Sequence, residues 1–157
     1  MKITALILLP FLCAASGRAE DAVNFSGRWK ATGTFTERRT GAPPTTSPCS
    51  EVSVAITHAG NTLTVDNYKA DCGTIKTDWG PIAMTIKNGK VYEGDEETGT
   101  LAGNLLKTTS KSGGVSYAFN LRLTPASKTS PAILATYYGV GSAMGAMVIE
   151  GNLQIVP

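Results

Sequence analysis

The side chains that most often carry catalysis or bind metals are few in this chain. It has one histidine, His58, and no second histidine that could complete a metal site or activate a nucleophile. The Gly-x-Ser-x-Gly turn that presents a serine nucleophile is absent. We therefore expect a protein that is not an enzyme, with no catalytic residue, no bound metal and no cofactor.

Two other segments only weakly resemble sites that bind an ion or a phosphate group. The acidic stretch 93–97 is the only dense charge cluster, but it lacks the full loop pattern of a known calcium site and is more typical of a soluble turn at a sheet edge. Gly139, Gly141 and Gly145 could suggest a phosphate loop, but no helix pattern follows them. We interpret both segments as turns.

Aromatic and methionine side chains are the better candidates for function. Tyr117, Phe119, Tyr137 and Met147 fall on segments with strand character, and side chains of these types adapt to irregular apolar ligands. They could line a cavity that binds a small molecule. The alternative is that they only fill the core, as side chains do in most small barrels.

Strand patterns must position these residues. Apolar and polar residues alternate from Ser50 to the end of the chain, with Val52, Val54 and Ile56 on one face. The Asn88-Gly89 pair is a strong hairpin signal because both residues tolerate positive φ angles. We predict an all-β fold with about eight to ten short strands, as a barrel or a sandwich, and the meander of hairpins favours a single antiparallel up-and-down barrel.

One segment departs from the alternation. Residues 37–48 contain two arginines, three prolines and several threonines, which predicts a long surface loop. Long ordered loops are often functional, so this loop is a candidate for contact with a partner protein; a merely solvated linker is the alternative.

The first predicted strand begins with Gly27, Arg28 and Trp29. This Gly-x-Trp resembles the opening motif of the lipocalin and calycin group of β-barrels. The resemblance implies a lipocalin-like barrel in which Trp29 closes one end and Gly27 permits close strand approach. It is carried by these residues and by the regular spacing of the predicted strands.

The N-terminus predicts export. Lys2 is followed by an apolar run to Ala15 and by small residues up to Ala19, the pattern of a secretory signal peptide over residues 1–19. Cleavage leaves one domain, residues 20–157, without a segment of roughly 20 apolar residues that could span a membrane as a helix. We expect the protein in the periplasm or secreted. Lipid attachment at Cys13 is an alternative, which Leu12 before it disfavours.

Removal of the signal changes the charge and the cysteine count. Loss of Lys2 and Arg18 leaves 12 basic and 12 acidic residues, so a general affinity for nucleic acid or anionic membranes is not expected. Loss of Cys13 leaves Cys49 and Cys72, which we predict to form a disulfide in an oxidising compartment.

Together these features favour an exported, non-catalytic barrel that holds a small apolar or amphipathic ligand in its interior. The second hypothesis is an inhibitor or adaptor that engages a partner protein through loops such as 37–48.

Overall fold

The computed structural model describes residues 23–157, so the predicted signal peptide lies outside the described residues. The described chain is all-β, without a helix, and its eleven strands pair in antiparallel fashion. The strands are β1 (Gly27–Arg39), β2 (Thr45–Ala59), β3 (Thr62–Cys72), β4 (Ile75–Trp79), β5 (Ile82–Lys87), β6 (Lys90–Glu93), β7 (Glu96–Ala102), β8 (Leu105–Ser112), β9 (Val115–Thr124), β10 (Ile133–Ser142) and β11 (Gly145–Val156).

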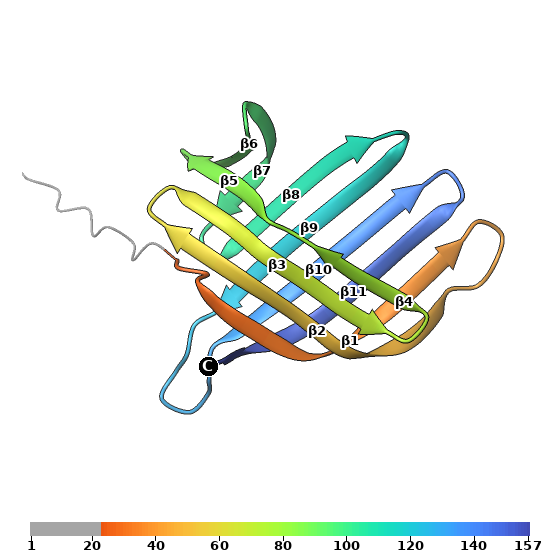
Figure 1. Cartoon of the computed structure of the whole chain (residues 1–157), viewed down its shortest axis with the longest axis horizontal. Coiled ribbons are helices and arrows are strands. Elements are labelled where there is room, and N and C mark those ends of the chain that lie inside the picture. Colours follow the sequence, from red (N-terminus) through yellow and green to blue (C-terminus); the bar gives the residue numbers. More distant parts are fainter. Residues whose placement is uncertain (1–22) are drawn as a thin grey trace, which may run out of the picture.

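Ten of these strands form a closed ring with up-and-down connections, which confirms the predicted barrel architecture at the upper end of the expected strand number. Each ring strand pairs with its sequence neighbours, except that β4 is left out of the ring and β1 closes it against β11. In Figure 1, β2, β3 and β4 cross in front of β8 to β11, and the short β6–β7 hairpin stands at the top.

Period-2 alternation places the core inside the ring. In β2, Val52, Val54 and Ile56 are buried as predicted, and in β9 so are Leu121 and Leu123. The Asn88-Gly89 turn also forms as predicted, with φ angles of 53° and 76° between the paired Lys87 and Lys90.

The edge of β3 is divided between two partners. Its first half, Thr62 to Val65, pairs with β5, and its second half, Tyr68 to Cys72, pairs with β4. Between them the chain passes Gly80, where a Cβ would lie 2.5 Å from the carbonyl oxygen of Asp66. Only glycine allows this close approach, so β4 and β5 share one edge of β3 with a break between them.

Trp29 lies buried at the end of the ring where β1 begins, with 3% of its surface exposed. Its Nε1 donates to the carbonyl oxygen of Phe25, which is fully buried. His58, near the end of β2, holds this segment in place: its backbone N–H donates to Ser26 Oγ at 2.8 Å, and its Nδ1 accepts a longer hydrogen bond from Phe25 N–H. His58 is thus a structural residue at this end of the ring.

The predicted loop over residues 37–48 was wrong in extent. The structure continues β1 to Arg39 and begins β2 at Thr45, with Glu37 opposite Thr45, so only residues 40–44 are a turn. Long-range pairing with β1 stabilises the Thr- and Pro-rich residues as a strand although their local composition is typical of a loop.

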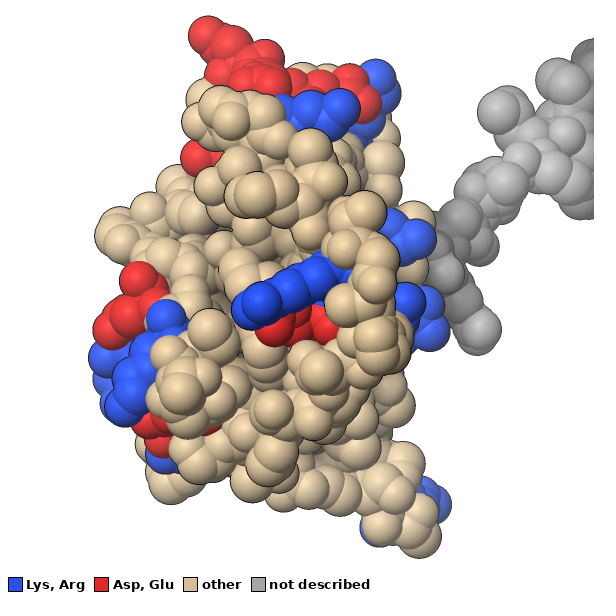
Figure 2. Space-filling model, turned by 90° about the vertical axis from the view of Figure 1, so that its right-hand side faces the viewer, with Lys and Arg blue, Asp and Glu red and all other residues tan. Residues whose placement is uncertain are grey.

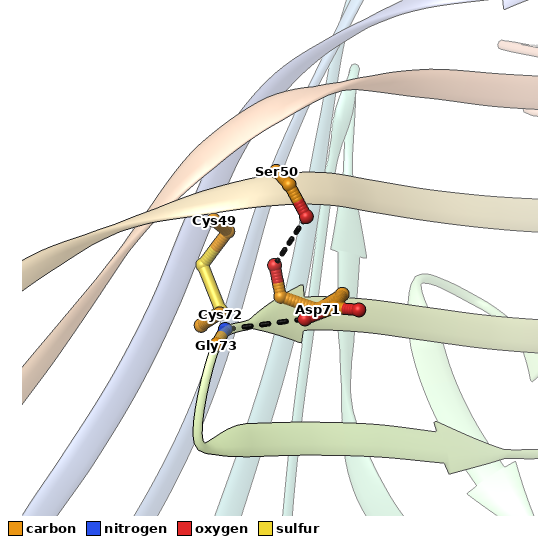
Figure 3. Close-up of a disulfide and its surroundings, with 5 residues drawn as sticks. All are labelled: Cys49, Ser50, Asp71, Cys72 and Gly73. Atoms are coloured by element: carbon orange, nitrogen blue, oxygen red, sulfur yellow. Dashed lines mark hydrogen bonds between the residues drawn. A yellow bond between two sulfur atoms is a disulfide. The ribbon is translucent and has the colours of Figure 1, made fainter.

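The predicted disulfide between Cys49 and Cys72 is present and links β2 to β3 (Figure 3). Beside it, Ser50 Oγ donates to the carbonyl oxygen of Asp71, and the Asp71 carboxylate accepts a hydrogen bond from Gly73 N–H. Both cysteines are buried, so the cross-link is part of the core.

The outer surface is mostly uncharged on the face shown in Figure 2, and its acidic and basic side chains lie in mixed groups. Across β1 to β4 these charges pair: Lys30 with Glu51, Lys69 with Asp78, and Lys76 with Asp71. Within residues 23–157, no helix has the length and apolar character to cross a bilayer.

Loss of the disulfide should destabilise the fold. The bridge spans a sequence separation of 23 residues, and the Cys49→Ala/Cys72→Ala double variant should lower the free energy of unfolding by about 3 kcal/mol, because the unfolded chain gains conformational freedom. Urea unfolding of the oxidised protein, the reduced protein and the variant measures this. A loss below about 1 kcal/mol would contradict the expected role.

Acidification should weaken the end of the ring near His58. Burial lowers the pKa of the His58 imidazole below 6.5, so the unfolded chain binds a proton more readily than the folded chain. The free energy of unfolding should therefore fall as the pH drops below about 6.5. Urea midpoints at two pH values, about 7.5 and 5.5, test this, and His58→Asn should remove most of the difference. An equal pH dependence in both proteins would show that other groups cause it.

Candidate functional site

The ring is closed by strand pairing, but hydrogen bonding between strands is incomplete along part of one side. β4 pairs with β3 alone, and β8 pairs with β7 only from Leu105 to Thr108. The remaining residues of β8, 109–112, have no strand on that side among the described residues, because the β6–β7 hairpin is too short to reach them. The outcome is an opening in the side of the ring between β4 and β8.

A cavity of about 180 Å³ lies behind this opening. We call it the aromatic pocket. Its walls come from eight strands, β3 to β10, and the lining residues are Val65, Trp79, Ile82, Met84, Glu93, Thr98, Thr108, Thr109, Ser110, Tyr117, Ala118, Phe119 and Tyr138. Apolar and aromatic side chains form most of the surface, with hydroxyl groups on the β8 side, a composition typical of small-molecule sites.

Four aromatic rings from four strands pack together at this pocket. Tyr68 stacks on Trp79 with ring centroids 5.1 Å apart, and Phe119 meets Trp79 edge-on at 5.2 Å. Tyr138 lies 5.5 Å from Tyr68 and 5.7 Å from Trp79. Such pairs stabilise by about 0.5–1.5 kcal/mol each beyond burial, so the rings form a rigid wall.

Two buried polar atoms in this cluster have no hydrogen-bond partner within residues 23–157. They are the hydroxyl oxygen of Tyr68 and Nε1 of Trp79. An unpartnered buried donor costs about 1–3 kcal/mol, and native proteins rarely leave one without a reason. A ligand with a hydrogen-bond acceptor would satisfy the Trp79 donor.

Burial also fixes the protonation of the tyrosines. It raises the pKa of Tyr68 far above its usual range, with a smaller contribution from Tyr138. Burial raises the pKa of Tyr138 as well, with help from Tyr117. Both phenols therefore stay protonated at any ordinary pH and can donate a hydrogen bond.

The structure brings together only two of the four residues predicted to bind a ligand. Tyr117 and Phe119 line the aromatic pocket. Tyr137 lies on the outer face of the sheet, because adjacent strand residues point to opposite faces and Tyr138 takes the inner position. Met147 shares the face of buried Ile149 but lies near the beginning of β11, beside the β10–β11 turn, and 37% of it is exposed.

Two further aromatic residues that line the pocket, Tyr138 and Trp79, also have side chains of the type expected at a cavity or its rim, whereas Tyr68, which stacks on Trp79, has no such signal in the sequence. Tyr138 lies directly opposite Phe119, so the pairing of β9 with β10 is what gives the inner position to Tyr138 and not to Tyr137. Tyr68 and Trp79 face each other across β3 and β4, a short pairing that no local pattern reveals.

The other candidates take surface positions. The acidic stretch forms the β6–β7 turn, where Glu97 pairs with Lys90, and Glu93 is one of the residues that line the aromatic pocket. Gly145 follows the β10–β11 turn. In the described part of the chain, no three His, Cys, Asp or Glu side chains gather as metal ligands.

No protein-family model, no curated protein and no solved structure matches the chain.

Removal of the Tyr68 hydroxyl should stabilise the protein without ligand. The Tyr68→Phe variant keeps the stacked ring and deletes a buried polar atom that has no partner, so we expect the free energy of unfolding to rise by about 1 kcal/mol. Urea unfolding measures it. Tyr137→Phe on the outer face is the matched control and should change stability by less than about 0.5 kcal/mol. A clear loss of stability in Tyr68→Phe would mean that the hydroxyl is hydrogen-bonded.

Proposed function

We propose that this protein is an exported, non-catalytic binding protein that holds one small aromatic molecule with a hydrogen-bond acceptor in the aromatic pocket. The observation that carries the proposal is Trp79, which lines the pocket and whose buried Nε1 has no hydrogen-bond partner within residues 23–157; Tyr68 Oη, in the ring stacked on Trp79, is a second such atom. A bound acceptor would relieve the cost of at least one of them.

The size of the pocket limits the ligand. About 180 Å³ is available, and an apolar protein cavity of about 150 Å³ accommodates benzene. The ligand is therefore one ring with a few additional heavy atoms, which is smaller than the ligands of pockets of about 300 Å³ or more.

The lining sets the chemistry. Flat aromatic walls from Trp79, Phe119 and Tyr138 favour a planar ligand, which can stack or meet their edges. Trp79 Nε1 can only donate, so the ligand must accept. A ring that carries a carbonyl group meets these conditions, and a pure hydrocarbon does not.

The side opening between β4 and β8 provides the route of entry. Thr108 and Ser110 from β8 and Glu93 from β6 supply polar groups to a lining that is otherwise mostly apolar. On entry, a ligand would lose its hydration water and form contacts with the aromatic side chains instead.

The setting fits an exported carrier. The Cys49–Cys72 disulfide supports an oxidising compartment, periplasmic or extracellular. A closed ring with buried Trp29 at the start of its first strand supports the lipocalin-like interpretation of Gly27 and Trp29.

Binding of two isosteric ligands tests the proposal. Acetophenone has a ring and a carbonyl acceptor; α-methylstyrene has the same shape with a methylene group in place of the oxygen. Calorimetric titration of the protein should give about tenfold tighter binding of acetophenone, the difference expected for one hydrogen bond.

Two variants show whether the named atoms are responsible. Trp79→Phe and Tyr68→Phe each remove one polar atom and keep an aromatic ring, and at least one should abolish the preference for acetophenone, while Tyr137→Phe should keep it. The absence of binding at millimolar concentration, or an unchanged preference in both variants, would overturn the proposal.

A further inference from the structure

The outer face of the sheet carries a second concave surface, separate from the aromatic pocket. It is an open groove of about 830 Å³ over β8, β9, β10, β11 and β1, which we call the outer groove. Its lining residues are Ala31, Thr32, Gly33, Thr34, Leu105, Lys107, Asn120, Arg122, Ala135, Thr136, Tyr137, Glu150, Gly151 and Asn152. It shares no lining residue with the aromatic pocket.

Strand register aligns its polar groups in a row across five strands. Each residue of the row lies directly opposite the next, in the order Thr34, Glu150, Tyr137, Asn120 and Lys107. A second row lies two residues away along each strand, on the same face. In it each residue lies directly opposite the next, in the order Asn152, Ala135, Arg122 and Leu105. Side chains of paired residues lie close enough to act on one ligand.

Tyr137 forms the centre of the first row. Gly139, two residues along the same strand, is buried under it: a Cβ at Gly139 would come within 2.9 Å of the Tyr137 ring. The ring therefore lies over the glycine, along the sheet surface, as a platform in the outer groove.

The polar groups beside this platform are unpaired. Within residues 23–157, the side chains of Lys107, Asn120, Arg122, Glu150 and Asn152 make no hydrogen bond or ion pair with another residue. The outer face of β1 to β4 differs, since Lys30, Lys69 and Lys76 there each pair with a carboxylate. Unpaired donors and acceptors that gather in a groove are available to a ligand.

We propose that the outer groove binds a carboxylate-bearing oligosaccharide. The apolar C–H face of a sugar ring stacks on Tyr137, and its hydroxyl groups exchange hydrogen bonds with Asn120, Asn152 and Glu150, which together supply donors and acceptors. Lys107 and Arg122, on neighbouring strands β8 and β9, form the basic end of the groove and bind the sugar carboxylate. This binding is independent of the small-molecule site.

Two trisaccharides that differ only in charge test this inference. Trigalacturonate carries free carboxylates, and its fully methyl-esterified form has the same rings without charge. Calorimetric titration should show about tenfold tighter binding of the free acid, with the difference reduced by added salt. The Arg122→Gln variant should lose the preference for the free acid.

Variants at the platform and at the other site complete the test. Tyr137→Phe keeps the ring and should bind trigalacturonate normally, whereas Tyr137→Ala should weaken binding at least tenfold; melting curves show whether each variant is folded. Trp79→Phe, in the aromatic pocket, should leave trigalacturonate binding unchanged. If neither trisaccharide binds at millimolar concentration, or if Arg122→Gln and Tyr137→Ala both bind as the original protein does, the inference is wrong.

Discussion

Backbone pairing along β3 is the constraint on which the rest of the structure depends. A strand edge can hydrogen-bond to one neighbour at each residue, and β3 gives its first half to β5 and its second half to β4. The ring therefore continues from β3 into β5, β6 and β7 only at the end where the first half of β3 lies. At the other end the hydrogen-bonded wall has a gap between β4 and β8, and side chains from both of these strands line the aromatic pocket.

The same alternation gives β9 and β10 two separate roles. Their inward residues, including Phe119 and Tyr138, form part of the aromatic pocket, and their outward residues, including Arg122 and Tyr137, line the outer groove. One pair of strands thus supports two surfaces with different chemistry, one apolar and enclosed, the other polar and open. Because the two sets of side chains lie on opposite faces, a change in one set leaves the other in place.

Much of the fold follows from local sequence signals, and the site does not. Alternation in β2 and β9, the Asn88-Gly89 turn and the even cysteine pair each depend on neighbouring residues or on compartment, so they can be predicted. Adjacent Tyr137 and Tyr138 leave the inward residue undecided, since Ile133 and Leu134 fit either phase. Residues 45–48 and the Tyr68–Trp79 contact depend on pairing partners that are distant or weakly marked in the sequence.

The position of the disulfide determines how the side opening behaves. Cys72 ends β3 directly opposite Ile75 of β4, and Cys49 ties that end to β2 (Figure 3). β4 pairs with β3 along one edge only, but both of its ends are held: Cys72 anchors the turn before Ile75, and Trp79 continues through Gly80 and Pro81 into β5, which also pairs with β3. We therefore expect the opening to keep a fixed shape, so that the size and shape of a molecule, and not a movement of β4, determine whether it can enter.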